Sequence, residues 1–95
     1  MPEMRFRIRW PDGTVETCYS PSLVVKDFLA PSETYALAEF LERSRAALAI
    51  ASERVEAKYG WPCSRAASQL ARIETAASAF AGDPAAWVAV EAFEE

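Results

Sequence analysis

The feature that most constrains the fold is a strict alternation near the N-terminus, in the stretch MRFRIRWPDGTVETCY. In MRFRIRW every second residue is apolar and the residues between them are arginines. This period of two is typical of a β-strand that is buried on one face. The turn signal PDG follows, and then the β-prone stretch TVETCY. We therefore expect a β-hairpin over residues 4–19.

The turn chemistry also predicts how the two strands pair. We expect Asp12 and Gly13 to form a two-residue turn, which is a common hairpin connection. The expected pairs are then Trp10–Val15, Arg9–Glu16 and Phe6–Tyr19. This register keeps the apolar side chains on one face and the charged ones on the other. It also places Cys18 on the outer face, together with Arg7.

The outer face of this hairpin carries a row of three arginines, Arg5, Arg7 and Arg9. Such a row could bind an anion or a nucleic acid. The net charge of the chain is −4, and nucleic-acid-binding domains are usually basic. We therefore interpret the row as a solvated sheet face and expect no nucleic-acid partner.

Two longer segments carry the spacing of amphipathic helices. Apolar residues recur at steps of three and four over residues 36–59 and again over residues 62–81. Gly60 suits the cap after the first helix, and Gly82 is expected to stop the second. The two helices should form an antiparallel hairpin. Its alanine-rich apolar stripe could close within one chain, between two chains, or both.

A shorter helix is expected between the two hairpins. Ser20 is a good N-cap and Pro21 a good first helical residue, so we predict a helix over residues 21–29. Pro31 then ends it, because proline cannot continue a helix. The residues 32–35 that follow are interpreted as a connector.

The C-terminal segment fits two structures. Asp83 and Pro84 could begin a third helix. The alternative is a strand over residues 86–93, in which side chains alternate between two sets: Val88, Val90 and Ala92 against Trp87, Ala89, Glu91 and Phe93. We favour the strand, because an isolated hairpin is marginal in water and a third strand completes a sheet. The fold class is thus α+β in one domain, residues 1–95: a small antiparallel sheet covered by the helical hairpin and the short helix.

Composition limits the chemistry of this chain. It has two cysteines and no histidine, so Ser-His and Cys-His catalytic pairs are excluded, and so is a zinc site with histidine ligands. We expect no metal and no cofactor. The apolar runs are too short for a membrane span, and the N-terminus lacks the order of a signal peptide, so we expect a cytoplasmic protein without a membrane partner. In that compartment both cysteines should be reduced.

Cys18 is the candidate nucleophile. It precedes the expected helix N-terminus at Ser20, where unpaired N–H groups lower the pKa of a thiol and attract anions. Ser20 and Ser22 add hydroxyl groups to this anion site. The alternative interpretation is a small buried side chain beside an ordinary cap. Cys63 opens the second helix near Arg65, and the same two interpretations apply to it.

A second candidate patch lies in the long helix, in the stretch ERSRAALAIASERV. Its polar members are Ser44, Arg45, Ser52, Glu53 and Arg54. Ser44 and Ser52 are about two helical turns apart, as are Arg45 and Ser52, so each pair shares a face. Arg45, Ser52 and Arg54 are candidate ligands for an anion. Serines in an apolar stripe also mark a close helix crossing, which is the favoured interpretation.

Several stretches together resemble a known protein family. The segments RWPDG, CYSPS and ASERV, and YG followed by CS, are similar to small bacterial proteins of the nitrogen-starvation response. The resemblance runs from Met1 to about Gly82. It implies a chain encoded beside a nitrilase, a radical SAM protein and an acetyltransferase-like protein, in clusters linked to nitrile or cyanide nitrogen use. It carries no catalytic residue onto this sequence.

Three hypotheses for function follow. The first is a non-enzymatic accessory or interaction protein, a homodimer that works with other products of the cluster. The second is a small enzyme or carrier in which Cys18 is a thiolate and the Ser20–Ser22 segment holds an anion. The third is a small-molecule sensor with a pocket between sheet and helices.

Overall fold

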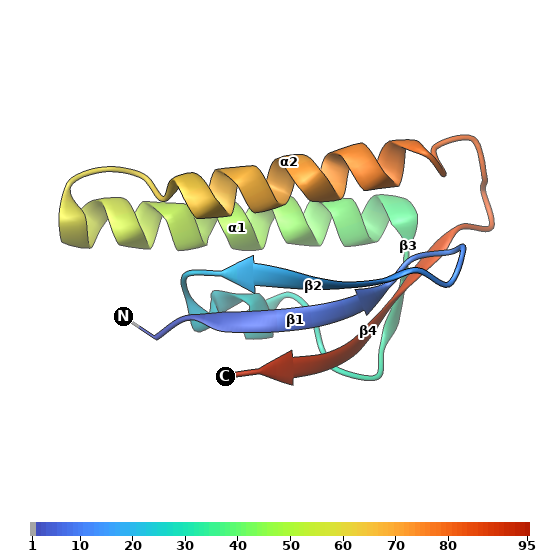
Figure 1. Cartoon of the computed structure of the whole chain (residues 1–95), viewed down its shortest axis with the longest axis horizontal. Helices are drawn as coiled ribbons and strands as arrows, with labels where there is room; N and C mark the ends of the chain where they lie inside the picture. Colours follow the sequence, from blue (N-terminus) through green and yellow to red (C-terminus); the bar gives the residue numbers. More distant parts are fainter. Residues whose placement is uncertain (1) are drawn as a thin grey trace.

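The computed structural model describes residues 2–95. A four-stranded antiparallel sheet has the strand order β2-β1-β4-β3, and the two α-helices lie as a layer across one of its faces (Figure 1). The elements are β1 (Met4–Arg9), β2 (Val15–Ser20), the 3₁₀-helix η1 (Leu23–Asp27), β3 (Thr34–Ala36), α1 (Leu37–Tyr59), α2 (Ser64–Ser78) and β4 (Trp87–Glu94). The predicted α+β class, with a helical hairpin on a small antiparallel sheet, is confirmed.

The core lies between the sheet and the helical layer. Phe6 and Ile8 of β1 are buried there against Phe40 of α1 and Ile73 of α2. The alternation in β1 produces this arrangement, because every second side chain faces the helices. Within one chain α1 and α2 pack against each other, so at least one use of the alanine-rich stripe is internal.

The predicted register of the first hairpin is wrong by one residue. Trp10 accepts a hydrogen bond from the Gly13 N–H at 2.9 Å, and its own N–H donates to Thr14 at 2.8 Å. Gly13 has a φ of 89°, so the loop contains three residues and ends in a left-handed glycine. The observed pairs are Arg9–Val15, Ile8–Glu16, Phe6–Cys18 and Arg5–Tyr19.

This correction changes which side chains face the core. Cys18 lies on the buried face beside Phe6, and not on the outer face with Arg7. Glu16 also faces inward and accepts a hydrogen bond from the Trp10 indole at 3.0 Å. Arg9 is therefore paired not with Glu16 but with Glu91 of β4, at 3.0 Å. The three arginines of β1 are exposed, as expected for a solvated sheet face.

The long helix agrees with its prediction to within one residue. Gly60 follows it with a φ of 92°, and its N–H donates to Glu56 at 2.8 Å. The second helix is shorter than the expected range of 62–81, because it begins at Ser64 and its last helical residue is Ser78. Irregular turns occupy the chain from there to β4, so Gly82 does not end the helix.

The short helix also differs from its prediction over residues 21–29. It is a five-residue 3₁₀-helix whose N-cap is Ser22, since the Ser22 hydroxyl accepts the Val24 N–H at 3.3 Å. Ser20 is the last residue of β2 and caps no helix. The displaced start follows from the hydrogen bonds that the two serines exchange with each other.

The C-terminal strand is present, and a bulge changes its faces. Arg7 pairs with Ala92 and Ile8 with Val90, so Glu91 is an extra residue in β4. The bulge brings Phe93 against the core together with Val88 and Val90, whereas simple alternation put it in the other set, with Trp87. The expected connector at residues 32–35 also contains part of a strand, because β3 pairs with the first residues of β4.

Candidate functional site

The structure buries the candidate nucleophile. Cys18 is fully buried in β2, in the same hydrophobic cluster as Phe6 and Val25. Burial, with a smaller contribution from the Glu16 carboxylate, raises the pKa of the Cys18 thiol far above its usual range. The neighbouring helix is a five-residue 3₁₀-helix. The sulfur is therefore a packed, protonated group.

Ser20 and Ser22 are also buried, and their hydroxyl groups are used within the protein. The Ser20 hydroxyl donates to the Ser22 carbonyl at 2.7 Å and accepts the Ser22 N–H at 3.3 Å. The Ser22 hydroxyl accepts from Val24 and from the Arg54 guanidinium, at 3.3 and 3.1 Å. These bonds fasten the turn between β2 and η1 to α1. They bring the predicted ligands Arg54 and Ser22 together, but as partners of each other, with the Ser22 hydroxyl accepting from Arg54.

The polar residues of α1 point to different partners. Arg45 forms an ion pair with Glu74 of α2 at 3.2 Å. The Ser52 hydroxyl accepts the Cys63 N–H at 3.3 Å, and Glu53 is exposed. Ser44 is buried, and its hydroxyl has no hydrogen-bond partner among residues 2–95. The structure thus distributes the predicted patch over separate places along the helix.

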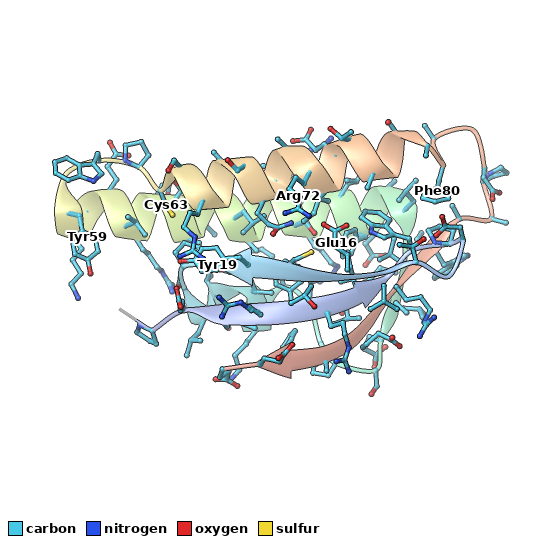
Figure 2. All side chains as sticks on the ribbon, viewed as in Figure 1. Glu16, Tyr19, Tyr59, Cys63, Arg72 and Phe80 are labelled. Atoms are coloured by element: carbon cyan, nitrogen blue, oxygen red, sulfur yellow. The ribbon has the colours of Figure 1, made fainter. Side chains whose placement is uncertain are left out.

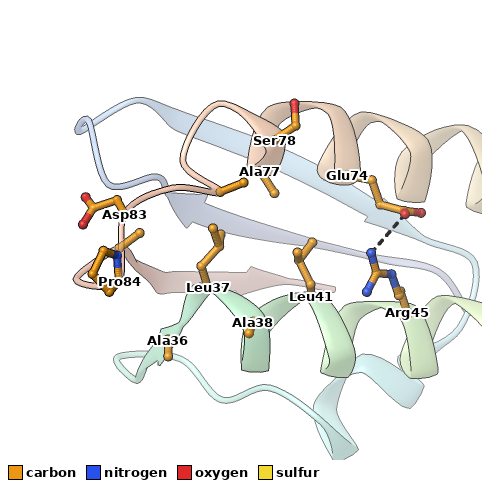
Figure 3. Close-up of a pocket in the computed structure, with 12 residues that line it drawn as sticks. Ala36, Leu37, Ala38, Leu41, Arg45, Glu74, Ala77, Ser78, Asp83 and Pro84 are labelled. Carbon is orange, nitrogen blue, oxygen red and sulfur yellow. Dashed lines mark hydrogen bonds and ion pairs between the residues drawn. The ribbon is translucent and has the colours of Figure 1, made fainter.

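A cavity of about 530 Å³ lies where the start of α1, the end of α2 and the segment before β4 meet (Figure 3). We call it the helix-end cavity. Leu37, Leu41 and Ala77 supply apolar walls, and the Arg45–Glu74 ion pair lies at one end. Asp83 lies at the other end (Figure 3). The volume falls in the range of roughly 300–1,000 Å³ that is typical of small-molecule sites.

Of the residues around this cavity, only Arg45 was a candidate from the sequence. Leucine and alanine carry no signal of a binding site, because they are most often buried in a hydrophobic core. The cavity arises from the way α2 ends early and the following turns fold back on the start of α1. The helix predicted over residues 62–81 therefore gave no reason to expect a cavity here.

The connection between α1 and α2 carries exposed aromatic side chains. It projects beyond the sheet at one end of the molecule, with Tyr59 at that end (Figures 1 and 2). The Trp61 side chain is 71% exposed, and Tyr59 is also exposed. By contrast, Trp10 is buried, with its ring stacked on Phe80 at 6.2 Å. We call Tyr59 and Trp61 the aromatic tip.

Cys63 lies next to the aromatic tip. It is the N-cap residue of α2, half-buried, and a free thiol, as Cys18 is. The two cysteines are not joined by a disulfide in this structure.

The family described as "Nitrogen starvation-induced protein NitG" matches residues 5–93. The chain belongs to this family. No curated protein and no solved structure matches it significantly. The match extends into β4 as far as Phe93, and thus further toward the C-terminus than the resemblance read from the sequence motifs.

Two features are absent from residues 2–95. None of the helices in this range is both long enough and apolar enough to cross a membrane. The same range contains no group of three or more cysteine and carboxylate side chains arranged to hold a metal ion.

Proposed function

We propose that this member of the NitG family is a cytoplasmic, non-enzymatic accessory protein of a bacterial nitrogen-starvation response. It acts by binding a protein encoded in the same gene cluster, the neighbourhood of a nitrilase. Family membership supports the nitrogen-starvation context. The exposure of the aromatic tip is the observation that most directly supports a role in protein binding.

The tip has the properties of a contact surface. Tryptophan and tyrosine are enriched among the residues that dominate binding energy at protein interfaces. They bury a large area while losing little side-chain entropy. Trp61 is 71% exposed, so most of its surface remains available to a partner. The tip also stands at the end of a molecule whose extents are 40 × 23 × 18 Å, where another protein can reach it from several directions.

The test is direct binding between purified proteins, with the co-encoded nitrilase, radical SAM protein and acetyltransferase-like protein as partners. Trp61→Ala should weaken the complex by about 2 kcal/mol or more, which is roughly a 30-fold rise in Kd. Trp87→Ala is the matched control, because Trp87 is an exposed tryptophan in β4. Equal Kd values for both variants, or no binding to any of the three proteins, would contradict the proposal.

We also propose that the protein forms a homodimer. The helical layer carries exposed alanines, such as Ala49 of α1 and Ala67 of α2, and small side chains allow the close approach of a second copy. Sedimentation equilibrium should give twice the chain mass of 10.5 kDa. A mass equal to one chain at all concentrations would overturn this part of the proposal.

A second candidate function is a small-molecule sensor, favoured by the helix-end cavity. A ligand that binds only the folded protein raises its apparent stability. Thermal-shift screening with nitriles, amides, amino acids and nucleotides should then find a compound that raises Tm. Ala38→Leu, an exposed lining position, should fill part of the cavity and abolish that shift. If the shift survives in the variant, the cavity is not the binding site.

The enzyme or carrier hypothesis has less support. The thiol of this hypothesis is Cys18, whose sulfur is fully buried and whose pKa is raised by that burial. A thiolate nucleophile needs the opposite environment, with access to solvent and a lowered pKa.

A further inference from the structure

A cavity at the start of α2 collects hydrogen-bond donors from both α2 and β2. It measures about 270 Å³ and lies between the edge strand β2 and the first turns of α2. Its lining residues are Tyr19, Ser64, Arg65, Ser68, Gln69 and Arg72. Figure 2 shows Tyr19 and Arg72 on the side of the molecule where β2 faces α2. We call it the arginine cavity. We propose that it binds a phosphate group, either as free phosphate or as part of a small metabolite.

The charge of the side chains that line the arginine cavity favours an anion. The described residues that line the arginine cavity include two arginines and no carboxylate, in a chain whose net charge is −4. The remaining lining side chains are hydroxyl groups and an amide, which can donate hydrogen bonds to an anion. Such a concentration of donors stands out on an acidic protein. It favours an anionic ligand with several acceptor oxygens.

The buried side chain of Gln69 also favours a ligand in this cavity. It is only 5% exposed, and its Oε1 accepts the Tyr19 N–H at 3.0 Å. This bond fixes the orientation of the amide, so Nε2 is the free end. Among residues 2–95, Nε2 has no hydrogen-bond partner. A buried donor without a partner costs free energy, and a ligand oxygen in the cavity that Gln69 lines would satisfy it.

The two arginines are available to a ligand. Each has one carboxylate near it, Glu3 for Arg65 and Glu16 for Arg72, at 3.8 Å in both cases. This distance is longer than a good charge-assisted hydrogen bond, and both guanidinium side chains are mostly exposed. Their N–H groups are therefore largely unsatisfied by the protein.

Tyr19 positions one of these groups. The Arg65 guanidinium lies 3.8 Å from the centre of the Tyr19 ring, which orients its plane before any ligand arrives. Burial, together with the neighbouring Glu3 carboxylate, raises the pKa of Tyr19. The phenol therefore stays protonated at neutral pH and adds no negative charge to the cavity.

The start of α2 adds a favourable field. Its N-cap residue, Cys63, provides no side-chain hydrogen bond, and the first turn contains no acidic residue. The positive end of the helix is thus left without the usual compensation from within residues 2–95. A phosphate dianion matches two guanidinium groups and a helix N-terminus better than a single carboxylate does.

The experiment uses the full chain and NMR titration with three probes: inorganic phosphate, adenosine monophosphate and acetate. Phosphate should shift the amide signals of the first turns of α2 and of Tyr19, with acetate binding at least about tenfold more weakly. A stronger response to the nucleotide identifies a metabolite phosphate, and an equal response identifies free phosphate; both support a phosphate site. Acetate binding as tightly as phosphate would overturn the assignment.

Two sets of variants locate the site. Replacing both Arg65 and Arg72 by glutamine should raise the Kd for phosphate about tenfold or more, because two charge-assisted contacts are lost. Gln69→Glu keeps an oxygen for the Tyr19 N–H but replaces the free amide by a negative charge, so it should abolish binding. Replacing both Arg7 and Arg9 by glutamine removes the same two charges from the exposed sheet face and should leave the Kd unchanged.

Circular dichroism should show that each variant is folded. If Gln69→Glu does not fold, the double variant at Arg65 and Arg72 still tests the proposal. If the Arg7 and Arg9 double variant weakens binding as much as the Arg65 and Arg72 double variant does, the effect is one of overall charge and the site is refuted. No signal shift with millimolar phosphate would also refute it. Neither result bears on the aromatic tip, because the partner-binding test uses different residues.

Discussion

The burial of Cys18 leads to a quantitative prediction about its reactivity. In a Cys63→Ser background, Cys18 is the one remaining thiol, and it should react with iodoacetamide only when the protein opens. Domains are stable by about 0.05–0.15 kcal/mol per residue, hence roughly 5–14 kcal/mol for 95 residues. At the lower end, the unfolded fraction is below about one in a thousand, since about 1.4 kcal/mol corresponds to a factor of ten.

We therefore expect alkylation of Cys18 at pH 7 to be at least about a thousandfold slower than in the urea-unfolded chain. Mass spectrometry of samples quenched over time measures both rates on the same protein. The matched variant is Cys18→Ala, which keeps the half-buried Cys63 and should react much faster when folded.

Two results would refute this reasoning. One is a Cys18 rate within a factor of about ten of the unfolded chain, because a fully buried sulfur cannot react at that rate without opening. The other is a reaction whose pH midpoint lies well below the unperturbed thiol pKa of about 8.5, which would indicate an activated thiolate. Either result would restore the enzyme or carrier hypothesis.

Three further predictions concern stability. Because the folded pKa of Cys18 is raised, its contribution to stability is complete below the unfolded pKa of about 8.5 and falls above it, at up to about 1.4 kcal/mol per pH unit. Urea unfolding from pH 7 to 10 should show this loss of stability in the wild type and a smaller loss in Cys18→Ala. Parallel curves of stability against pH for the two proteins would contradict the prediction. Gly60→Ala should cost about 1–2 kcal/mol through its positive φ, whereas Gly82→Ala, which lacks one, should change stability little; equal midpoints in urea would argue against this cause. Phe40→Ala should cost about 3–5 kcal/mol by leaving a cavity in the core, and a loss below about 1 kcal/mol in the same assay would mean that Phe40 is not packed as described.

The elements with strong periodicity were predictable from the sequence. The alternation in β1 and the three-and-four spacing of α1 are properties of each segment alone, and Gly60 marks the end of α1 with a local conformational requirement. These features need no knowledge of the rest of the chain. They were sufficient for the fold class.

The errors arose where a neighbouring element decides the structure. The stretch PDG fits both a two-residue and a three-residue loop, and the choice moves Cys18 and Glu16 from one face of the sheet to the other. Likewise, the bulge at Glu91 depends on pairing with β1, and β3 exists only because β4 lies beside it. Local sequence contains no information on such partners.

The candidate sites show the same limit. Ser20 and Ser22 carry the residue types of an anion site, but Arg54, more than thirty residues away, uses one of their hydroxyl groups. The arginine cavity joins Tyr19 of β2 to a helix that begins at Ser64. Only the packing of α2 against β2 brings these groups together.

The hydrogen bond between Tyr19 and Gln69 has a consequence for self-association. β2 is at the edge of the sheet, and an edge strand with free backbone groups invites added strands from other molecules, the route to fibrils. At Tyr19 a glutamine side chain already takes the backbone N–H that an incoming strand would need. Gln69 of α2 thus hinders the addition of further strands at Tyr19. The protein can therefore present its surfaces to partners without polymerising along this edge.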